Sequence, residues 1–235
     1  MRSAIIIPTY NEADNIAKLV EMVLAVDNEF DVIVVDDNSP DGTSERVRNK
    51  FASNPRVSII TRTKKDGRGG AVIEGIKFAL NKGVYKKILE MDADFSHDPA
   101  ELYSVIQKSN EVDVVIGSRY LPKSRIEGWP LQRKVFSKAA NLYAKTLLRI
   151  PISDYTNGYR CYSIEAAKSI EQAEIKSKGY IVLSEIAYQL FKKGFKFGEV
   201  PTVFVNRKRG ISNLNIGEIV EAFTSIWNLK YKHRS

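Results

Sequence analysis

The sequence predicts an α/β fold with a mostly parallel central sheet flanked by helices. Short apolar runs rich in Ile and Val alternate with stretches of helical periodicity through the first half of the chain. The chain has 235 residues, of which 43% are hydrophobic and 27% are charged, so it is long enough to bury a complete core. We therefore expect a single domain over residues 1–235.

Five apolar runs in the first half predict strands, because each is short and is bounded by turn-forming residues. Four stretches between them have the apolar spacing of helices, and several begin at a capping residue or have Pro99 near the first turn. The predicted strands are 3–7, 31–35, 57–61, 85–91 and 113–117. The predicted helices are 13–26, 43–51, 69–81 and 100–109.

The alternation of strands and helices stops after Arg119. A long amphipathic helix is predicted over 130–148, followed by a short strand at 159–162 and helices at 164–173 and 181–193. A strand at 196–203 and a helix at 216–229 complete the prediction. The sequence contains no repeat, low-complexity segment or obvious linker, which agrees with one continuous domain.

The net charge of +8 and the pI near 9.4 favour an anionic partner. Nucleotide phosphates, nucleic acid and an acidic membrane face all have the required charge. The basic surplus lies in the second half, where Glu127 is the only acid between Arg119 and Arg149. Nucleic acid is the least favoured partner, because the predicted strand ends are acidic and no nucleic-acid-binding motif is present.

The sequence favours a cytosolic location. Cys161 is the only cysteine and cannot form an internal disulfide, and no charged-then-apolar signal segment opens the sequence. The longest apolar runs, such as residues 4–7, are far shorter than the roughly 18 to 20 residues that cross a bilayer. We therefore expect no membrane-spanning helix.

Carboxylates follow three of the predicted strands. In an open parallel sheet, ligands bind beyond the carboxyl ends of the strands. Carboxylates gathered at one edge repel each other unless a cation or a hydrogen-bond donor lies among them, and a divalent ion with phosphates meets that need. Asp92 and Asp94 are suited to hold a hard cation together with a ribose or phosphate, although a turn or a helix cap is the alternative for this short segment. The three segments are Pro8-Thr9-Tyr10-Asn11-Glu12, residues 36–43 and Asp92-Ala93-Asp94.

Two further segments suggest nucleotide binding. Asp37 could accept hydrogen bonds from the N–H edge of a base, as carboxylates do when they read base edges. Gly67-Arg68-Gly69-Gly70 opens a predicted helix, where backbone N–H groups and the Arg68 charge could meet a phosphate. The sequence lacks the motifs of P-loop and dinucleotide enzymes, and its two histidines, His97 and His233, form no evident catalytic triad. Phosphate transfer of the P-loop type, hydride transfer and covalent hydrolysis are therefore disfavoured.

The motifs are more specific together than alone. Segments 8–12, 35–43, 91–99 and 117–120 together resemble the family 2 glycosyltransferases, which have the Rossmann-like GT-A fold. Three later segments resemble the dolichyl-phosphate mannose synthase subgroup, and the similarity runs from about Ile5 to Phe223. These later segments are Arg133-Lys134 with Ser137 and Asn141, residues 154–160, and Phe204-Val205-Asn206-Arg207.

The resemblance implies an inverting enzyme that transfers one hexose, with mannose from GDP-mannose favoured, to dolichyl or polyprenyl phosphate at the cytosolic face of a membrane. Residues 1–120 would form the nucleotide-sugar-binding half and residues 121–235 the acceptor-binding half, with amphipathic membrane-facing helices. The acceptor phosphate is already an anionic nucleophile at neutral pH, so no general base is needed. A UDP-glucose or other UDP-sugar enzyme is the alternative, and a non-catalytic nucleotide-binding membrane scaffold is a remote one.

The resemblance also implies the residues of the site. A divalent metal, Mg²⁺ or Mn²⁺, would be held by Asp94 and Ser96, and Asp94, Arg119 and Arg133 would be the catalytic residues. Ser96 stands where some relatives have a glutamine, and Asn213 stands where a lysine often occurs. The implied donor-site residues are Pro8, Tyr10, Glu12, Val35, Asp37, Arg68, Asp92, Ala93, Asp94, Arg119 and Arg207, and the implied acceptor-phosphate residues are Arg133, Ser137, Arg207 and Asn213.

The basic stretch over residues 128–150 is predicted to dock peripherally at an anionic membrane, with or without a separate membrane-anchor protein. Packing of an ordinary amphipathic helix against the sheet is the alternative. The predicted apolar anchors are Trp129, Leu131, Val135, Phe136, Leu142, Leu147 and Leu148, and the predicted headgroup contacts are Arg133, Lys134, Lys138, Lys145 and Arg149.

Overall fold

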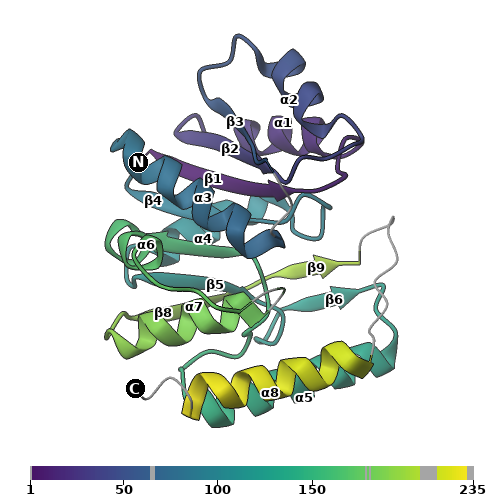
Figure 1. Cartoon of the computed structure of the whole chain (residues 1–235), viewed down its shortest axis with the longest axis vertical. Coiled ribbons are helices and arrows are strands. Elements are labelled where there is room, and N and C mark those ends of the chain that lie inside the picture. Colours follow the sequence, from purple (N-terminus) through teal and green to yellow (C-terminus); the bar gives the residue numbers. More distant parts are fainter. Residues whose placement is uncertain (1, 64–66, 178, 180, 207–215, 232–235) are drawn as a thin grey trace.

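A seven-stranded sheet runs through the middle of the molecule (Figure 1). The computed structural model describes residues 2–63, 67–177, 179, 181–206 and 216–231, without the side chains of 216–222. The strands are β1 (Ser3–Thr9), β2 (Phe30–Asp36), β3 (Val57–Thr61), β4 (Lys87–Glu90), β5 (Val114–Ser118), β6 (Arg125–Glu127), β7 (Arg160–Ser163), β8 (Phe197–Pro201) and β9 (Val203–Val205). The helices are α1 (Ile16–Val26), α2 (Thr43–Phe51), α3 (Gly67–Lys82), α4 (Leu102–Lys108), preceded by a 3₁₀ turn at Pro99–Glu101, α5 (Leu131–Leu148), α6 (Ile164–Glu171), α7 (Ile181–Lys192) and α8 (Ile216–Tyr231).

The sheet has the order β3-β2-β1-β4-β7-β5-β8 and is parallel except where β7 pairs with β4 and β5. This arrangement confirms the predicted mostly parallel sheet flanked by helices. The predicted boundary at residue 120 does not divide the sheet, because β7 and β8 come from the second half and β7 lies between two strands of the first. The assignment of separate donor and acceptor roles to the two halves stays a prediction.

Side chains point alternately to the two faces of the sheet along each strand, and helices cover both faces. Ile5 and Ile7 belong to a core cluster with α1, α2 and α4, whereas Ile6 belongs to the opposite cluster with α3, α6, α7 and α8. In Figure 1, α3, α6 and α7 lie in front of the sheet, and α1 and α4 lie behind it. A strand that is covered on both faces has a continuous apolar sequence, and for this reason β1 can be predicted from the sequence.

The strand predicted over 196–203 is wrong in its extent, because the chain changes sheets at Thr202. The Glu101 carboxylate accepts hydrogen bonds from the Thr202 hydroxyl and, at 2.9 Å, from the Val203 N–H. Segment β8 therefore ends in the main sheet, while β9 pairs with β6 in a separate two-stranded sheet. The sequence did not predict β6, because three residues are too few to display a strand period.

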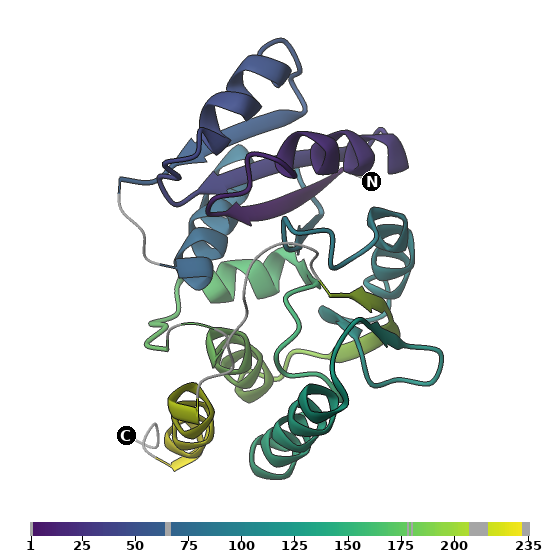
Figure 2. The ribbon, with the colours of Figure 1, turned by 90° about the vertical axis from the view of Figure 1, so that its right-hand side faces the viewer.

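Helices α5 and α8 form a pair at the end of the molecule opposite β3 (Figures 1 and 2). The ring of Phe223 in α8 lies 6.3 Å from that of Phe136 and 4.6 Å from that of Tyr143, both in α5. Within the described part of the chain, neither this pair nor any other helix is long and apolar enough to cross a bilayer.

Candidate active site

The strand ends that carry carboxylates meet at one edge of the sheet. Strands β2, β1 and β4 are neighbours and run parallel, so their carboxyl ends face the same side. The backbone N–H of Asp37 donates to the Thr9 carbonyl at 3.0 Å, and that of Met91 donates to the Ile6 carbonyl at 3.1 Å. The predicted convergence of the three segments is therefore present.

The two aspartates after β2 have different surroundings. Asp36 is fully buried and accepts hydrogen bonds from Thr9 Oγ1 at 2.8 Å and from Ser44 Oγ at 2.9 Å, so it organises the loop. Asp37 Oδ1 accepts from Arg62 Nη1 at 2.5 Å, and its Oδ2 accepts from the Gly67 N–H at 3.0 Å. A base would have to share these oxygens with the protein, and the role of Asp37 in base recognition stays a prediction.

Arg68 lies in a partly buried network beside β4, in which the side chains of Arg68 and Asp92 are 18% and 27% exposed. Its Nε donates to Asp92 Oδ1 at 2.7 Å, its Nη1 to Glu90 Oε2 at 2.7 Å, and its Nη2 to the Gly158 carbonyl at 2.9 Å. Glu90 is fully buried and also accepts from the Tyr162 hydroxyl at 2.6 Å. All three nitrogens of the guanidinium thus bond to the protein. The side chain reaches across β4 to the segment before β7, and the predicted contact of Arg68 with a phosphate stays a prediction.

The network fixes the charge of Asp92. Burial by itself would raise the pKa of Asp92, but the positive charge of Arg68 outweighs it, with help from Arg119, and lowers the pKa below its usual value. Asp92 is therefore an oriented, ionised carboxylate whose Oδ1 is occupied by Arg68.

Asp94 is half-buried, and its Oδ1 accepts the backbone N–H of Ser96 at 3.0 Å. Phe95 between them has a φ of 59°, which turns the chain sharply. Ser96 is 2% exposed, and its carbonyl accepts the Val205 N–H at 3.0 Å. This turn leaves Asp94 closer to solvent than Ser96. In the described residues, no group of three or more His, Cys, Asp or Glu side chains is arranged to hold a metal ion.

Arg119 follows β5 and is clamped by Asp154. Its Nε and Nη2 donate to the two carboxylate oxygens of Asp154 at 2.7 Å each, and its backbone N–H donates at 3.0 Å. Burial would raise the pKa of Asp154, but the Arg119 charge lowers it below its usual value. Asp154 was not among the predicted site residues, although it opens the segment 154–160 that carries part of the family resemblance.

Arg133 and Ser137 lie on the first turns of α5, close to Arg119. The Arg133 Cζ lies 4.1 Å from the ring centroid of Trp129, and the Arg119 Cζ lies 5.4 Å from the same centroid. The Tyr120 hydroxyl donates to Ser137 Oγ at 2.6 Å. The structure thus brings together Arg119, Arg133 and Ser137 from two elements. Arg207 and Asn213, also predicted for the acceptor site, lie outside the described residues.

The remaining predicted donor residues line the strand ends in different ways. Tyr10 is 40% exposed, and the Glu12 backbone N–H donates to Thr43 Oγ1 at 3.0 Å, while Pro8 is half-buried at the end of β1. Val35 and Ala93 are 0% and 3% exposed, with side chains in the core clusters. Only the backbone of these two residues is placed to meet a ligand at the edge.

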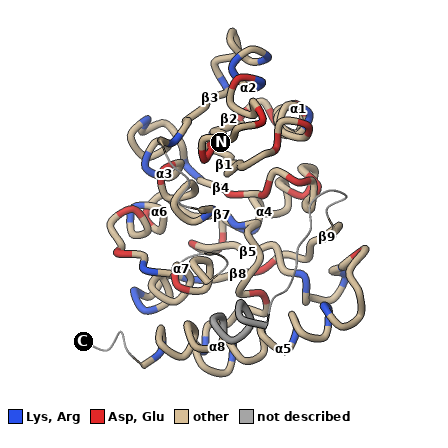
Figure 3. The backbone as a smooth tube through the Cα atoms, turned by 45° about the vertical axis from the view of Figure 1, so that its right-hand side comes forward, with Lys and Arg blue, Asp and Glu red and all other residues tan. Residues whose placement is uncertain are grey.

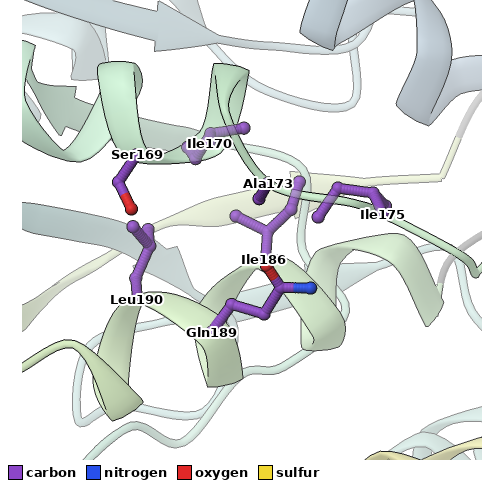
Figure 4. A pocket seen from close by; sticks show the side chains of 7 residues that line it. All are labelled: Ser169, Ile170, Ala173, Ile175, Ile186, Gln189 and Leu190. Atoms are coloured by element: carbon purple, nitrogen blue, oxygen red, sulfur yellow. The ribbon is translucent and has the colours of Figure 1, made fainter. Parts of the chain in front are cut away.

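A small pocket lies between α6 and α7, away from these strand ends (Figure 4). Its lining carries no ionisable side chain, and we assign it no part in the site. It is lined by Ser169, Ile170, Ala173, Ile175, Ile186, Gln189 and Leu190.

Known proteins resemble the chain in sequence and in fold. An undecaprenyl-phosphate mannosyltransferase from Micrococcus luteus is 38% identical over 231 residues, covering 97% of this chain and 95% of the relative. A polyprenol monophosphomannose synthase from Mycolicibacterium smegmatis is 37% identical over 233 residues, covering 97% and 88%.

Solved structures share the fold at low identity. Glucosyl-3-phosphoglycerate synthase from Mycobacterium tuberculosis, in complex with Mn²⁺, UDP and glucosyl-3-phosphoglycerate, aligns with a TM-score of 0.71 at 16% identity, covering 100% of this chain and 81% of that one. A mannosyltransferase from Pyrobaculum calidifontis, in complex with GDP-mannose and Mn²⁺, aligns with a TM-score of 0.60 at 21% identity, covering 89% and 58%. The expected GT-A-like architecture is confirmed.

Residues 4–170 match the family described as Glycosyl transferase family 2. That match covers more than half of the chain, and the two relatives above align over almost all of it. The predicted enzyme class, a glycosyltransferase, is thereby confirmed. The chain belongs to glycosyl transferase family 2.

Proposed function

We propose that this chain transfers one mannose from GDP-mannose to a polyprenyl phosphate, such as dolichyl or undecaprenyl phosphate, with inversion at the sugar. The observation that carries the proposal is the juxtaposition of an acidic edge with a pair of arginines. Asp92 lies close enough to Arg119 for the two charges to interact, and Arg119 shares the Trp129 ring with Arg133. A site with both signs of charge suits a metal-bound diphosphate beside a second phosphate. The names of the two mannose-transferring relatives support the choice of sugar and acceptor.

The acidic edge fits a divalent metal, Mg²⁺ or Mn²⁺, that is shared with the donor diphosphate. Mg²⁺ in nucleotide enzymes is commonly held by one or two carboxylates together with substrate phosphates, and Asp94 with Asp92 offers that number. Asp94 would hold the metal, and Ser96 is a second candidate. When bound, the metal would neutralise the charge that develops on the leaving diphosphate. Two structural neighbours contain Mn²⁺ together with a nucleotide or nucleotide sugar, which supports this proposal.

The acceptor phosphate supplies the nucleophile without help from a base. A phosphate monoester is mostly ionised at neutral pH, so the protein has to orient it and to offset repulsion between two anions. Arg119 and Arg133 would bind that phosphate, and Asp154 orients Arg119. Burial lowers the pKa of His97 to about 4, so this histidine is neutral at physiological pH and adds no charge to the site. A single displacement by the phosphate oxygen inverts the anomeric centre.

A donor screen tests the reaction. Purified protein with dolichyl phosphate and Mn²⁺ is given GDP-mannose, UDP-glucose or UDP-N-acetylglucosamine, and we expect lipid-linked product with GDP-mannose alone. Faster transfer from UDP-glucose would establish the alternative donor. Nucleotide binding without any transfer would establish the non-catalytic scaffold.

Calorimetry tests the role of Asp37. The variant Asp37→Ala should bind GDP more weakly by about 1 to 3 kcal/mol, since it lacks a hydrogen-bond acceptor for the base. Unchanged GDP binding would exclude base recognition by Asp37.

We also propose that α5 rests on the cytosolic face of a membrane, so that the lipid phosphate enters from that side. Figure 3 shows Lys and Arg along α5, which contains no acidic residue. Leu131, Val135 and Leu142 are 75%, 61% and 65% exposed and supply apolar contacts beside these charges. Two of the predicted anchors, Trp129 and Leu148, are 8% and 1% exposed, so they pack inside the protein and not against lipid.

Cosedimentation with anionic liposomes tests the membrane surface. The triple variant Lys134→Glu, Lys138→Glu, Lys145→Glu should bind less than the wild type, and wild-type binding should weaken as salt rises, because each basic residue contributes about 1 kcal/mol near an anionic surface. A matched control with the same charge change, Lys18→Glu, Lys77→Glu, Lys192→Glu, alters exposed lysines on other helices and should bind like the wild type. Equal binding by all three proteins would mean that a separate membrane protein presents the acceptor.

A further inference from the structure

The ring of Trp129 contacts two arginines that come from different parts of the chain. The guanidinium carbon of Arg133 is 4.1 Å from the Trp129 ring centroid, and that of Arg119 is 5.4 Å from it. Because both distances end on one ring, the two guanidinium carbons are no more than about 10 Å apart. Trp129 is only 8% exposed, so the protein holds the ring in place.

The two-stranded sheet of β6 and β9 fixes this ring. Gly128, which follows β6, has a φ of 74°, and its carbonyl accepts from Asn206 Nδ2 at 3.3 Å. A Cβ at Gly128 would lie 2.9 Å from the Asn206 Cβ, so glycine is required by both conformation and space. Phe204 in β9 packs its ring edge-on to Trp129, with centroids 5.3 Å apart. The constrained backbone at Gly128 and the ring of Phe204 together restrict the position of the indole.

An aromatic ring holds a cation in a way that a carboxylate cannot. The face of an indole attracts a guanidinium through its quadrupole, but it carries no charge and leaves the cation able to bind an anion. Asp154 already orients Arg119 and compensates part of its charge. A second carboxylate at position 129 would cancel the positive potential that a phosphate needs, whereas Trp129 orients both arginines and preserves it.

We infer that Trp129 is a positioning residue that holds Arg119 and Arg133 as a pair to bind the phosphate of the polyprenyl acceptor. The identity of that phosphate rests on the proposed function. The pairing of the two arginines rests on the geometry around the ring.

Steady-state kinetics with separate donor and acceptor titrations test the inference. Trp129→Leu should raise the KM for polyprenyl phosphate by about fivefold to fiftyfold, which corresponds to the loss of one or two cation–π contacts, and should leave the KM for GDP-mannose within about twofold. Trp129→Phe should restore most of the loss, since it keeps an aromatic face and the indole Nε1 has no hydrogen-bond partner among the described residues. The control Tyr103→Leu removes an aromatic side chain that is 58% exposed on α4 and should change neither constant. An unchanged acceptor KM in Trp129→Leu, or a failure of Trp129→Phe to improve on it, would overturn the inference.

Fluorescence supplies a readout that does not depend on turnover. The chain has two tryptophans, so Trp227→Phe makes Trp129 the only one. Titration of this protein with inorganic phosphate and with farnesyl phosphate should change Trp129 emission saturably, because anion binding moves the guanidinium groups on the ring. The same titration of a protein that also carries Arg133→Met should show a response at least about fivefold weaker. If neither phosphate changed the Trp129 emission, the inference would be overturned, even if the enzyme transferred mannose. If the emission changed as expected in a protein that transferred no mannose, the proposed function would be rejected and the arginine pair would stand.

Discussion

Replacement of His97 by Phe should remove a pH-dependent loss of stability. The His97 ring is 1% exposed, stacks on Tyr159 with centroids 4.7 Å apart at 16°, and meets the edge of Phe204 at 5.3 Å. The charge on Asp92 favours the protonated ring and Asn157 lies nearby, but neither ring nitrogen has a partner at hydrogen-bond distance among the described residues. Burial dominates and lowers the pKa of His97 from 6.5 to about 4.

The sign and size of the effect follow from proton binding. Between these two pKa values the unfolded chain binds a proton at this histidine and the native protein does not, so the free energy of unfolding rises with pH in that window. The stability that the neutral ring contributes is complete above pH 6.5 and is lost as the pH falls towards 4. The difference between 6.5 and about 4, at about 1.36 kcal/mol for each pH unit, amounts to roughly 3 kcal/mol.

Urea unfolding between pH 4 and pH 7.5 measures this contribution. The free energy of unfolding of His97→Phe minus that of the wild type should increase by roughly 3 kcal/mol as the pH falls from 6.5 to 4. The larger Phe ring adds a constant packing term that does not depend on pH. His97→Leu has a different packing term and should give the same pH dependence. A difference that stays constant over this range would refute a neutral, buried His97.

The other predictions concern the carboxylates and one close contact. Asp94→Ala should abolish metal-dependent transfer, because Asp94 is the proposed metal ligand. It should change the free energy of unfolding by less than about 1 kcal/mol, because the side chain is only half-buried and lies at a strand end. Near wild-type turnover with Mg²⁺ or Mn²⁺ would contradict the donor assignment. Asp154→Asn should cost about 3 to 5 kcal/mol in urea unfolding and reduce kcat/KM, because it leaves buried Arg119 without its counter-charge; a stability equal to that of the wild type would show that the pair is not needed. Gly75→Ala should cost about 1 to 3 kcal/mol, since the new Cβ would lie 2.6 Å from Ile6 Cγ2. The same substitution should cost less in an Ile6→Ala background, which lacks that atom; an equal cost in both backgrounds would place the strain elsewhere.

Much of the central sheet could be predicted because its strands are covered on both faces. Ile5, Ile6 and Ile7 are each fully buried, so β1 appears in the sequence as an unbroken apolar run, and the same holds for Val32 to Val35 in β2. The carboxylates could be located because they follow such runs directly. The apolar runs and the carboxylates that follow them are neighbours in the sequence, so a short segment is enough to predict them.

The networks that orient the site could not be predicted in the same way. Arg68 bonds to Glu90, Asp92 and Gly158, which are 22, 24 and 90 positions away along the chain. Arg119 and Asp154 are 35 positions apart. An arginine that closes an ion pair across elements has the same local sequence signature as one that faces solvent. Only the packed structure shows that Arg68 bonds to Glu90, Asp92 and Gly158.

The insertion of β7 between β4 and β5 has a consequence for synthesis of the chain. Strand β4 acquires its second neighbour only after residues 160–163 have left the ribosome, and both neighbours of β5 come from beyond residue 120. A nascent chain of 120 residues would carry most of the donor-site side chains but would expose unpaired strand edges, which favour aggregation. We therefore expect that the first half does not fold as an independent nucleotide-binding fragment, and that the sheet closes late in translation.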